Sequence, residues 1–257
     1  MSLERIGLLG RLGPGPNLKR LDRAMTAPTT VATRDLASMY GEMLSLRDRI
    51  DRMAATAERE LLTRVAATDG IHRPDQCDWA DRPAPWRQRI HPKGQVGVGS
   101  PLPIGGGITL FHDAVHADIS LRQDRVPVGI VGPNFGLVLE VYRFDGSFLS
   151  LVQDLPEPAL RGLTLNHLVG VQLRITREQP IEIYARLNVQ HGPNLEQIVR
   201  QFSFDGDHGA AEFDLAYTNI NEKRLEKAWL DLILEGPEMN RIAIWDMTLV
   251  RAPRADI

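Results

Sequence analysis

The sequence lacks several features that would each have indicated a class of protein. It contains one cysteine, Cys77, which excludes an internal disulfide framework. No run of about 18 apolar residues occurs, so no transmembrane helix is predicted. Charges at Glu4, Arg5 and Arg11 interrupt the N-terminal segment, so no Sec signal is predicted. We therefore expect a chain made in the cytoplasm, with release by a non-Sec route to a particle or cell surface left open.

Signature motifs of common enzymes are also missing. The sequence has no G-x-S-x-G elbow, no H-E-x-x-H, no P-loop and no dinucleotide-binding glycine pattern after a predicted strand. We therefore predict a protein with no catalytic residues and no cofactor. A polysaccharide-processing enzyme stays as an alternative; it needs two carboxylates about 5–9 Å apart across a groove, a distance that sequence does not give.

Potential metal ligands occur in two places, and neither has a recognised spacing. His112, Asp113 and His116 lie close together but have no fourth partner. Asp205-Gly206-Asp207 lacks the downstream glutamate of a calcium loop and is typical of a hairpin tip. We predict no metal site.

The larger part of the chain carries fewer basic than acidic residues, unlike a typical nucleic-acid-binding domain. Residues 1–93 carry 16 Lys and Arg against 12 Asp and Glu, whereas residues 94–257 carry 14 against 21. A nucleic-acid partner is therefore not expected, because the larger part of the chain is acidic. The opposite net charges of the two parts could help subunits to dock on one another.

The first third of the sequence predicts an arm followed by one long helix. Residues 1–32 are rich in Gly, Pro and Thr, which predicts a flexible arm. Residues 33–67 predict an amphipathic helix that Thr33 can cap. Its apolar residues follow heptad spacing: Leu36, Met39, Met43, Leu46, Ile50, Met53 and Ala57. Either the helix lies on its own domain, or it joins copies of the chain into a homo-oligomer.

Residues 68–106 predict an irregular strap. Six prolines and seven glycines between Asp69 and Gly107 exclude continuous helix or sheet. Trp79 and Trp86 lie seven residues apart in this segment. We favour a strap that these tryptophans hold on the following domain, with a glycan-stacking loop as the alternative.

Residues 107–257 predict an antiparallel, jelly-roll-like β-sandwich. Ten short apolar runs are separated by turn signals, with no long helical pattern between them. The stretch YRFDGSFLSL (142–151) surrounds Asp145-Gly146, which predicts a β-hairpin. The predicted strands are 108–111, 115–122, 136–144, 147–153, 168–176, 180–190, 196–204, 210–216, 227–234 and 240–251. Short helical turns are expected near 157–162 and 221–224, and both Trp229 and Trp245 are expected in the core.

One predicted strand, IEIYARLNVQ (181–190), carries a candidate binding face. Aliphatic residues alternate strictly with Tyr184, Arg186, Asn188 and Gln190, which therefore lie on one side of the strand. A ring beside guanidinium and amide groups is suited to the apolar faces and hydroxyls of a sugar. We identify this row as the glycan-binding candidate, with an ordinary solvated sheet face as the alternative. His191 and Asn194 would extend the site, and Glu140 and Tyr142 could line the same surface.

Two resemblances accompany these patterns. The final stretch, Ala228–Arg254, is similar to the closing strands of carbohydrate-binding jelly rolls. The runs Tyr142–Leu151, Glu212–Tyr217 and Asn221–Ile233 resemble an uncharacterised bacterial protein family over most of the chain, including the helix and the tryptophan segment. The first resemblance implies a sandwich topology, and the second implies no activity.

The sequence as a whole favours a non-catalytic protein that binds a glycan or another protein subunit. The N-terminal helix would assemble it into a homo-oligomer. The main alternative is a structural accessory or spike-base subunit of a phage-like particle.

Overall fold

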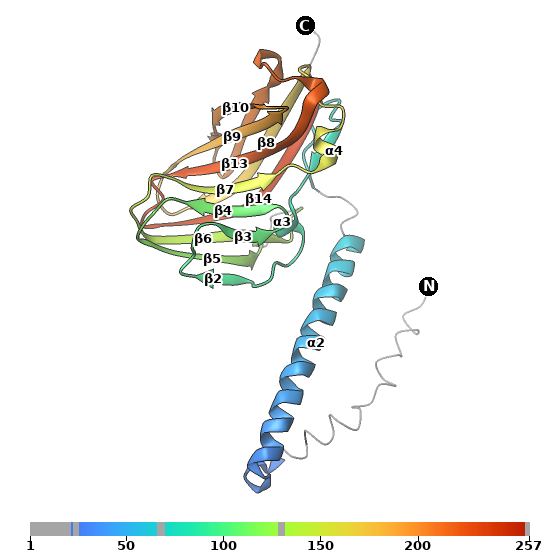
Figure 1. The fold of residues 1–257 in the computed structure, drawn as a ribbon, viewed down its shortest axis with the longest axis vertical. Coiled ribbons are helices and arrows are strands. Elements are labelled where there is room, and N and C mark those ends of the chain that lie inside the picture. The colour runs from blue at the N-terminus through green and yellow to red at the C-terminus, as the bar shows by residue number, and fades with distance from the viewer. Residues whose placement is uncertain (1–21, 23–25, 66–69, 128–131, 255–257) are drawn as a thin grey trace. The chain divides into compact units, whose positions relative to one another are not determined.

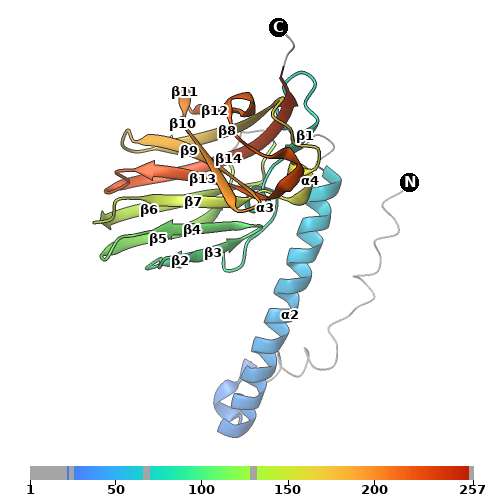
Figure 2. The ribbon, with the colours of Figure 1, turned by 45° about the horizontal axis from the view of Figure 1, so that its top comes forward.

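The computed structural model describes residues 22, 26–65, 70–127 and 132–254 (Figure 1). The chain divides into two compact units, Met1–Glu58 and Arg59–Ile257. The second unit is a sandwich of two antiparallel β-sheets stacked face to face (Figures 1 and 2). The predicted fold class is therefore confirmed.

The larger sheet has eight strands, and the last strand of the chain is at its centre. Strand β14 pairs with β8 on one side and with β6 and β1 on the other. The strands, in spatial order, are β11 (Ser203–Asp205), β12 (His208–Asp214), β8 (His167–Arg177), β14 (Asn240–Pro253), β6 (Phe135–Phe144), β5 (Ala117–Arg125) and β2 (Gly94–Val96), with β1 (Trp79–Asp81) added on β14.

The smaller sheet has six strands, and β9 and β13 make its longest pairing. In spatial order they are β10 (Asn194–Gln201), β9 (Glu182–His191), β13 (Leu225–Glu235), β7 (Leu149–Asp154), β4 (Ile108–His112) and β3 (Leu102–Gly105). The core lies between the two sheets, because alternate residues of each strand point inward and are buried. On β9 these are Ile183, Ala185, Leu187 and Val189, as the alternation predicts.

The hairpin prediction at Asp145-Gly146 is wrong. Strand β6 belongs to the eight-stranded sheet and β7 to the six-stranded sheet, so this turn carries the chain between the sheets. A Cβ on Gly146 would lie 2.5 Å from Asp113 Oδ1 and 2.7 Å from the Ala114 nitrogen. Glycine is therefore needed here for close packing against the 113–114 backbone and side chain.

The segment predicted as an irregular strap contains short regular elements. These are β1, α3 (Ala84–Arg87), β2 and β3. Trp86 is completely buried, and its indole Nε1–H donates to the Ile244 carbonyl at 2.9 Å. The buried Gln123 amide donates to the Pro85 and Gln88 carbonyls at 2.7 and 2.8 Å and accepts from the Ile90 N–H at 3.1 Å. One ring and one amide thus fix this segment to the sandwich.

In the part of the chain that the structure describes, the helices are few and one of them is long. Helix α2 spans Thr33–Val65. The short helices are η2 (Pro28–Thr30), α4 (Glu157–Leu160), η3 (Leu215–Tyr217) and η4 (Glu222–Arg224), and α4 and η4 lie at the two expected helical turns. Among the described residues, no helix is both long and apolar enough to cross a bilayer.

Candidate functional site

The predicted row on β9 lies on the outer face of the six-stranded sheet, which is the face turned away from the other sheet. Tyr184, Arg186 and Gln190 are partly exposed there, whereas Asn188 is completely buried. The sequence therefore placed all four side chains on the correct side of the strand. It did not reveal that one of them would be covered.

A buried polar network explains why Asn188 is covered. Asp231 on β13 is 3% exposed and lies opposite Arg186 in the sheet. The Arg186 guanidinium donates to Asp231 Oδ2 at 2.7 Å through Nε, and the two residues form an ion pair. Asn188 Nδ2 donates to the same oxygen at 3.2 Å, while Asn188 Oδ1 accepts from Gln197 on β10 at 2.7 Å. Four side chains from three strands thus hold one another in fixed positions.

The ends of the row have partners of their own. The Tyr184 hydroxyl donates to the Glu182 carboxylate, and this hydrogen bond raises the pKa of the tyrosine. Gln190 Nε2 donates to Glu226 Oε2 at 3.0 Å. Each predicted polar side chain therefore has a protein partner, and a ligand would meet a surface whose hydrogen bonds are already organised.

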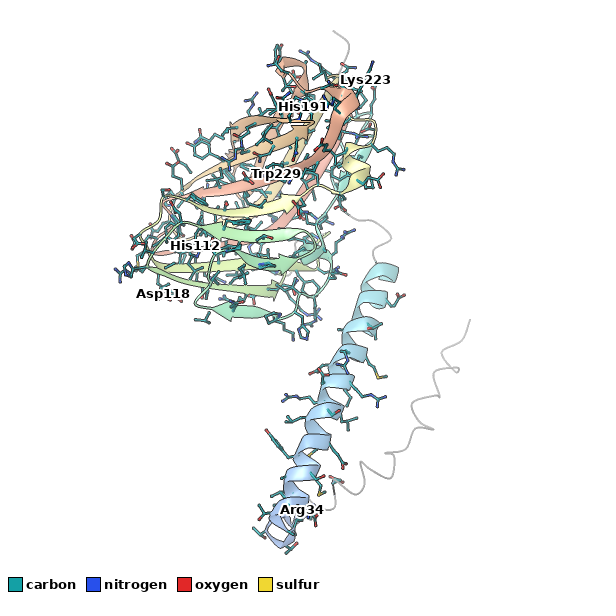
Figure 3. All side chains as sticks on the ribbon, in the orientation of Figure 1. Arg34, His112, Asp118, His191, Lys223 and Trp229 are labelled. Atoms are coloured by element: carbon teal, nitrogen blue, oxygen red, sulfur yellow. The ribbon has the colours of Figure 1, made fainter. Side chains whose placement is uncertain are left out.

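Apolar groups surround the network on the same face. Trp229 on β13 is labelled in Figure 3. It lies directly opposite Asn188, and the Lys227 ammonium lies 4.9 Å from the centre of its ring. At the sheet edge, Leu195 and Val199 of β10 are 48% and 49% exposed. Trp229 is half-buried, so its predicted place in the core is wrong, whereas Trp245 is buried as expected. The sequence missed Trp229 as a site residue because its neighbours are apolar on both sides.

Glu140 and Tyr142 do not line this surface, which corrects the sequence prediction. Both belong to β6 and lie on the outer face of the eight-stranded sheet. Glu140 Oε1 accepts from Arg122 at 2.8 Å, and this hydrogen bond lowers the pKa of the carboxyl. The Tyr142 hydroxyl donates to Glu140 Oε2 at 3.3 Å. Alternation within one strand cannot show to which of two sheets the strand belongs.

His191 and Asn194 also lie outside the candidate face. His191 ends β9 on the inward side and is 5% exposed, and its Nδ1 accepts from the Asn221 N–H at 3.3 Å. Asn194 is paired with His191 in register, so it shares the inward side of the sheet. The predicted extension of the site through this turn is therefore wrong.

The histidine and aspartate cluster near residue 113 organises loops. Asp113 Oδ1 accepts from the backbone N–H groups of Ser147 and Phe148 at 2.8 and 3.1 Å. His116 Nδ1 lies 2.8 Å from Asp145 Oδ2, and His112 Nε2 lies 3.2 Å from the Val98 carbonyl. Asp113 and His116 thus connect the loop between β4 and β5 to the turn between β6 and β7, and His112 contacts the segment before β3.

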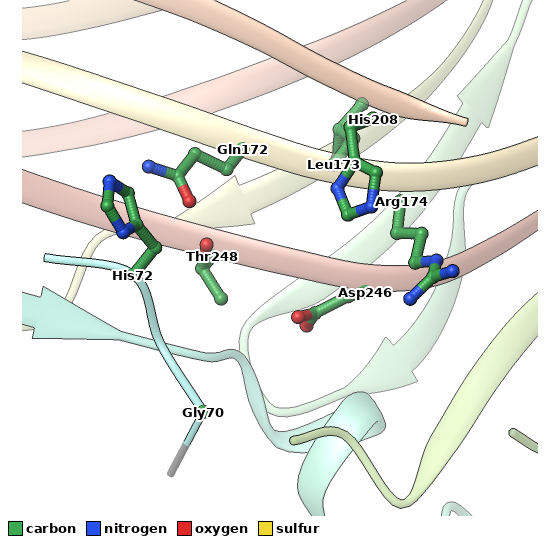
Figure 4. A pocket seen from close by; sticks show the side chains of 8 residues that line it. All are labelled: Gly70, His72, Gln172, Leu173, Arg174, His208, Asp246 and Thr248. Carbon is green, nitrogen blue, oxygen red and sulfur yellow. The ribbon is translucent and has the colours of Figure 1, made fainter. Parts of the chain in front are cut away.

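A polar pocket of about 140 Å³ lies on the outer face of the eight-stranded sheet (Figure 4). Its lining comes from the segment before β1 and from β8, β12 and β14: Gly70, His72, Gln172, Leu173, Arg174, His208, Asp246 and Thr248. The two opposite charges in it are already paired, Asp246 with Arg82 and Arg174 with Asp207. No local pattern predicts this pocket, because four separated segments build it.

A comparison with models of known protein families finds a match over the whole chain. A family model described as a family of unknown function (DUF6478) matches residues 1–257. The chain belongs to this family. The resemblance to an uncharacterised family is therefore confirmed, and membership brings no activity with it. No curated protein matches the chain.

Solved structures with some likeness include carbohydrate-binding modules. The CBM22-1 xylan-binding domain from Paenibacillus barcinonensis is 9% identical, with 72% of this chain and 100% of that chain covered and a TM-score of 0.37. A family 11 carbohydrate-binding module from Clostridium thermocellum is 10% identical, with 63% and 98% covered and a TM-score of 0.35. Tailspike protein 4 of bacteriophage CBA120 is 7% identical, with a TM-score of 0.37, and the match covers 57% of this chain and 19% of that chain. At these scores the likenesses carry no conclusion about what this chain binds.

Proposed function

We propose that this protein is a non-catalytic binding protein that recognises a glycan on the outer face of its six-stranded sheet. The observation that carries the proposal is the network of Arg186, Asp231, Asn188 and Gln197 beside Trp229. An ordinary solvated sheet face does not require a carboxylate and an amide that are both nearly inaccessible. Burying them costs free energy unless they are hydrogen-bonded and paired, and the network that provides these bonds also holds the neighbouring side chains in place.

The chemistry of the face suits a polyhydroxylated ligand. The rings of Tyr184 and Trp229 offer apolar surface to the C–H faces of a sugar, and the exposed part of the Arg186 guanidinium offers donors to its hydroxyls. Arg186 and Asp231 neutralise each other, so the centre of the face does not depend on a charged ligand. Organised polar groups lower the entropic cost of binding.

Two tyrosines provide a matched test of this face. Tyr184 and Tyr142 each donate a hydroxyl hydrogen bond to a carboxylate two residues earlier, but they lie on the outer faces of different sheets. Tyr184→Ala should weaken binding about tenfold, because a lost aromatic contact of about 1.4 kcal/mol corresponds to that factor. Tyr142→Ala should leave the affinity unchanged.

The measurement begins with a glycan array and the surface polysaccharide of the producing cell, probed with the full chain. Titration calorimetry on any retained glycan then compares the wild type with the two tyrosine variants, with melting curves as a control on folding. Absence of binding to every glycan, or an equal loss in both variants, would contradict the proposal.

A further inference from the structure

Helix α2 presents a narrow apolar seam that repeats every seven residues. Leu36, Met43 and Ile50 occupy the first position of the repeat, and Met39, Leu46 and Met53 occupy the fourth. The seam is buried at Met39, but it becomes exposed toward its C-terminal half, where Ile50 is 53% and Met53 is 68% exposed. Large apolar side chains at consecutive seam positions are thus open to solvent within one copy of the chain.

Most of the rest of the described helix surface is small or polar, which keeps the seam narrow; the exceptions are Tyr40 and Leu44, which are 60% and 37% exposed. Ser45 and Asp48 are exposed away from it, and Asp48 forms an ion pair with Arg52 on the same helix. A helix that lies on its own globular domain has a broader apolar stripe, with three to four apolar positions for every two turns. A seam formed by two apolar positions in every seven residues is typical of helices that pack against one another.

The charges beside the seam complement those of a second copy. Glu42 directly precedes the seam residue Met43, and Arg47 directly follows Leu46. In a parallel, in-register pair of helices, these two positions face each other across the interface. Glu42 of each copy then meets Arg47 of the other, and both side chains are exposed for this contact.

We propose that helix α2 binds helix α2 of a second copy of this chain, parallel and in register, along this seam. Three of its six apolar positions are methionines, whose flexible side chains pack adaptably but specify a partner weakly. Association is therefore concentration-dependent, and this interface brings the sandwiches of two copies into one assembly.

Sedimentation of the full chain over a range of concentrations tests the seam. Ile50→Asp places a charge in the interface and should weaken self-association at least tenfold. The control is Ala55→Asp, which adds the same charge on the exposed opposite side of the same helix and should leave the association unchanged. A monomeric wild type at all concentrations, or an equal effect of both variants, would overturn the proposal.

A charge exchange tests the orientation. Glu42→Arg should weaken association several-fold, because it places two arginines together at each flank of a parallel pair. Adding Arg47→Glu restores opposite charges and should recover the wild-type association. If the double variant remains as weak as the single one, the helices do not pair in parallel register.

Discussion

Arg82 and Asp246, which are 164 residues apart in the sequence, form a two-pronged ion pair between the segment after β1 and strand β14. The guanidinium donates through Nε to Oδ1 at 2.6 Å and through Nη2 to Oδ2 at 2.8 Å. Arg82 is 2% exposed and Asp246 is 19% exposed, so the guanidinium is held away from water while the carboxylate reaches the pocket. A second two-pronged pair, Arg251 with Asp78, joins the residue before β1 to the same strand β14 at 2.9 Å for both contacts.

Loss of the first pair should destabilise the sandwich strongly. Arg82→Met keeps most of the side-chain volume but leaves the Asp246 carboxylate without its cation, which should cost on the order of 3 kcal/mol. Arg87→Met, at an exposed pair 3.5 Å from Asp81, should cost less than about 1 kcal/mol. Urea unfolding gives both values, and equal costs would contradict this account.

The network under the candidate face should also support the fold. Alternation on one strand shows Arg186 only as an outward-facing side chain, but the structure places the nearly inaccessible Asp231 against it. We expect Arg186→Ala to cost about 2–3 kcal/mol, because a buried carboxylate loses its partner. Combining it with Asp231→Ala should cost less than the sum of the two single changes. Simple additivity in urea unfolding would show that the two groups do not interact.

Two glycine substitutions should have opposite effects. A Cβ on Gly41 in helix α2 meets nothing within 4 Å, so Gly41→Ala should stabilise the helix by up to about 1 kcal/mol. A Cβ on Gly136 would lie 2.6 Å from the Trp245 ring, so Gly136→Ala should destabilise the sandwich by about 1–3 kcal/mol. Circular dichroism of the helix and urea unfolding of the sandwich report the two outcomes. An increase in stability with Gly136→Ala would mean that the Trp245 ring moves freely.

Acid should weaken the sandwich below about pH 4. Hydrogen bonds from Arg122 and Arg174 lower the pKa values of Glu140 and Asp207 beneath their ordinary values of 4.5 and 3.8. The unfolded chain therefore binds protons more tightly than the folded protein. The stabilisation is complete above these ordinary values and is lost as the pH falls through the lower folded-state values. Asp207→Asn should lose less stability than the wild type between pH 5 and pH 3 in urea unfolding. An identical loss would exclude Asp207 as a contributor.

The sequence predicted the sandwich well because alternation is a local signal. Strand β9 shows this: its inward residues are all buried, as their spacing requires. Which strands share a sheet is not local information. Asp145-Gly146 has the chemistry of a hairpin, yet its flanking strands pair with other partners, and Glu140 is thereby separated from Arg186.

The candidate site was predicted only in part for the same reason. Tyr184 and Arg186 were found from one strand, whereas Asp231 and Trp229 come from a strand more than forty residues later. Register between β9 and β13 brings them together, and it depends on the whole sheet.

The central place of β14 has a consequence for folding during synthesis. Among the described residues this strand is the last regular element, yet it pairs with β8, β6 and β1 and forms ion pairs with the segment at residues 78–82. Until it leaves the ribosome, β6 and β8 each have an unpaired edge and Trp86 lacks the Ile244 carbonyl. Long-range pairing of this kind is slow and exposes strand edges to aggregation. We therefore expect a nascent chain that stops before residue 240 to depend on chaperones, and the eight-stranded sheet to close only after β14 has been synthesised.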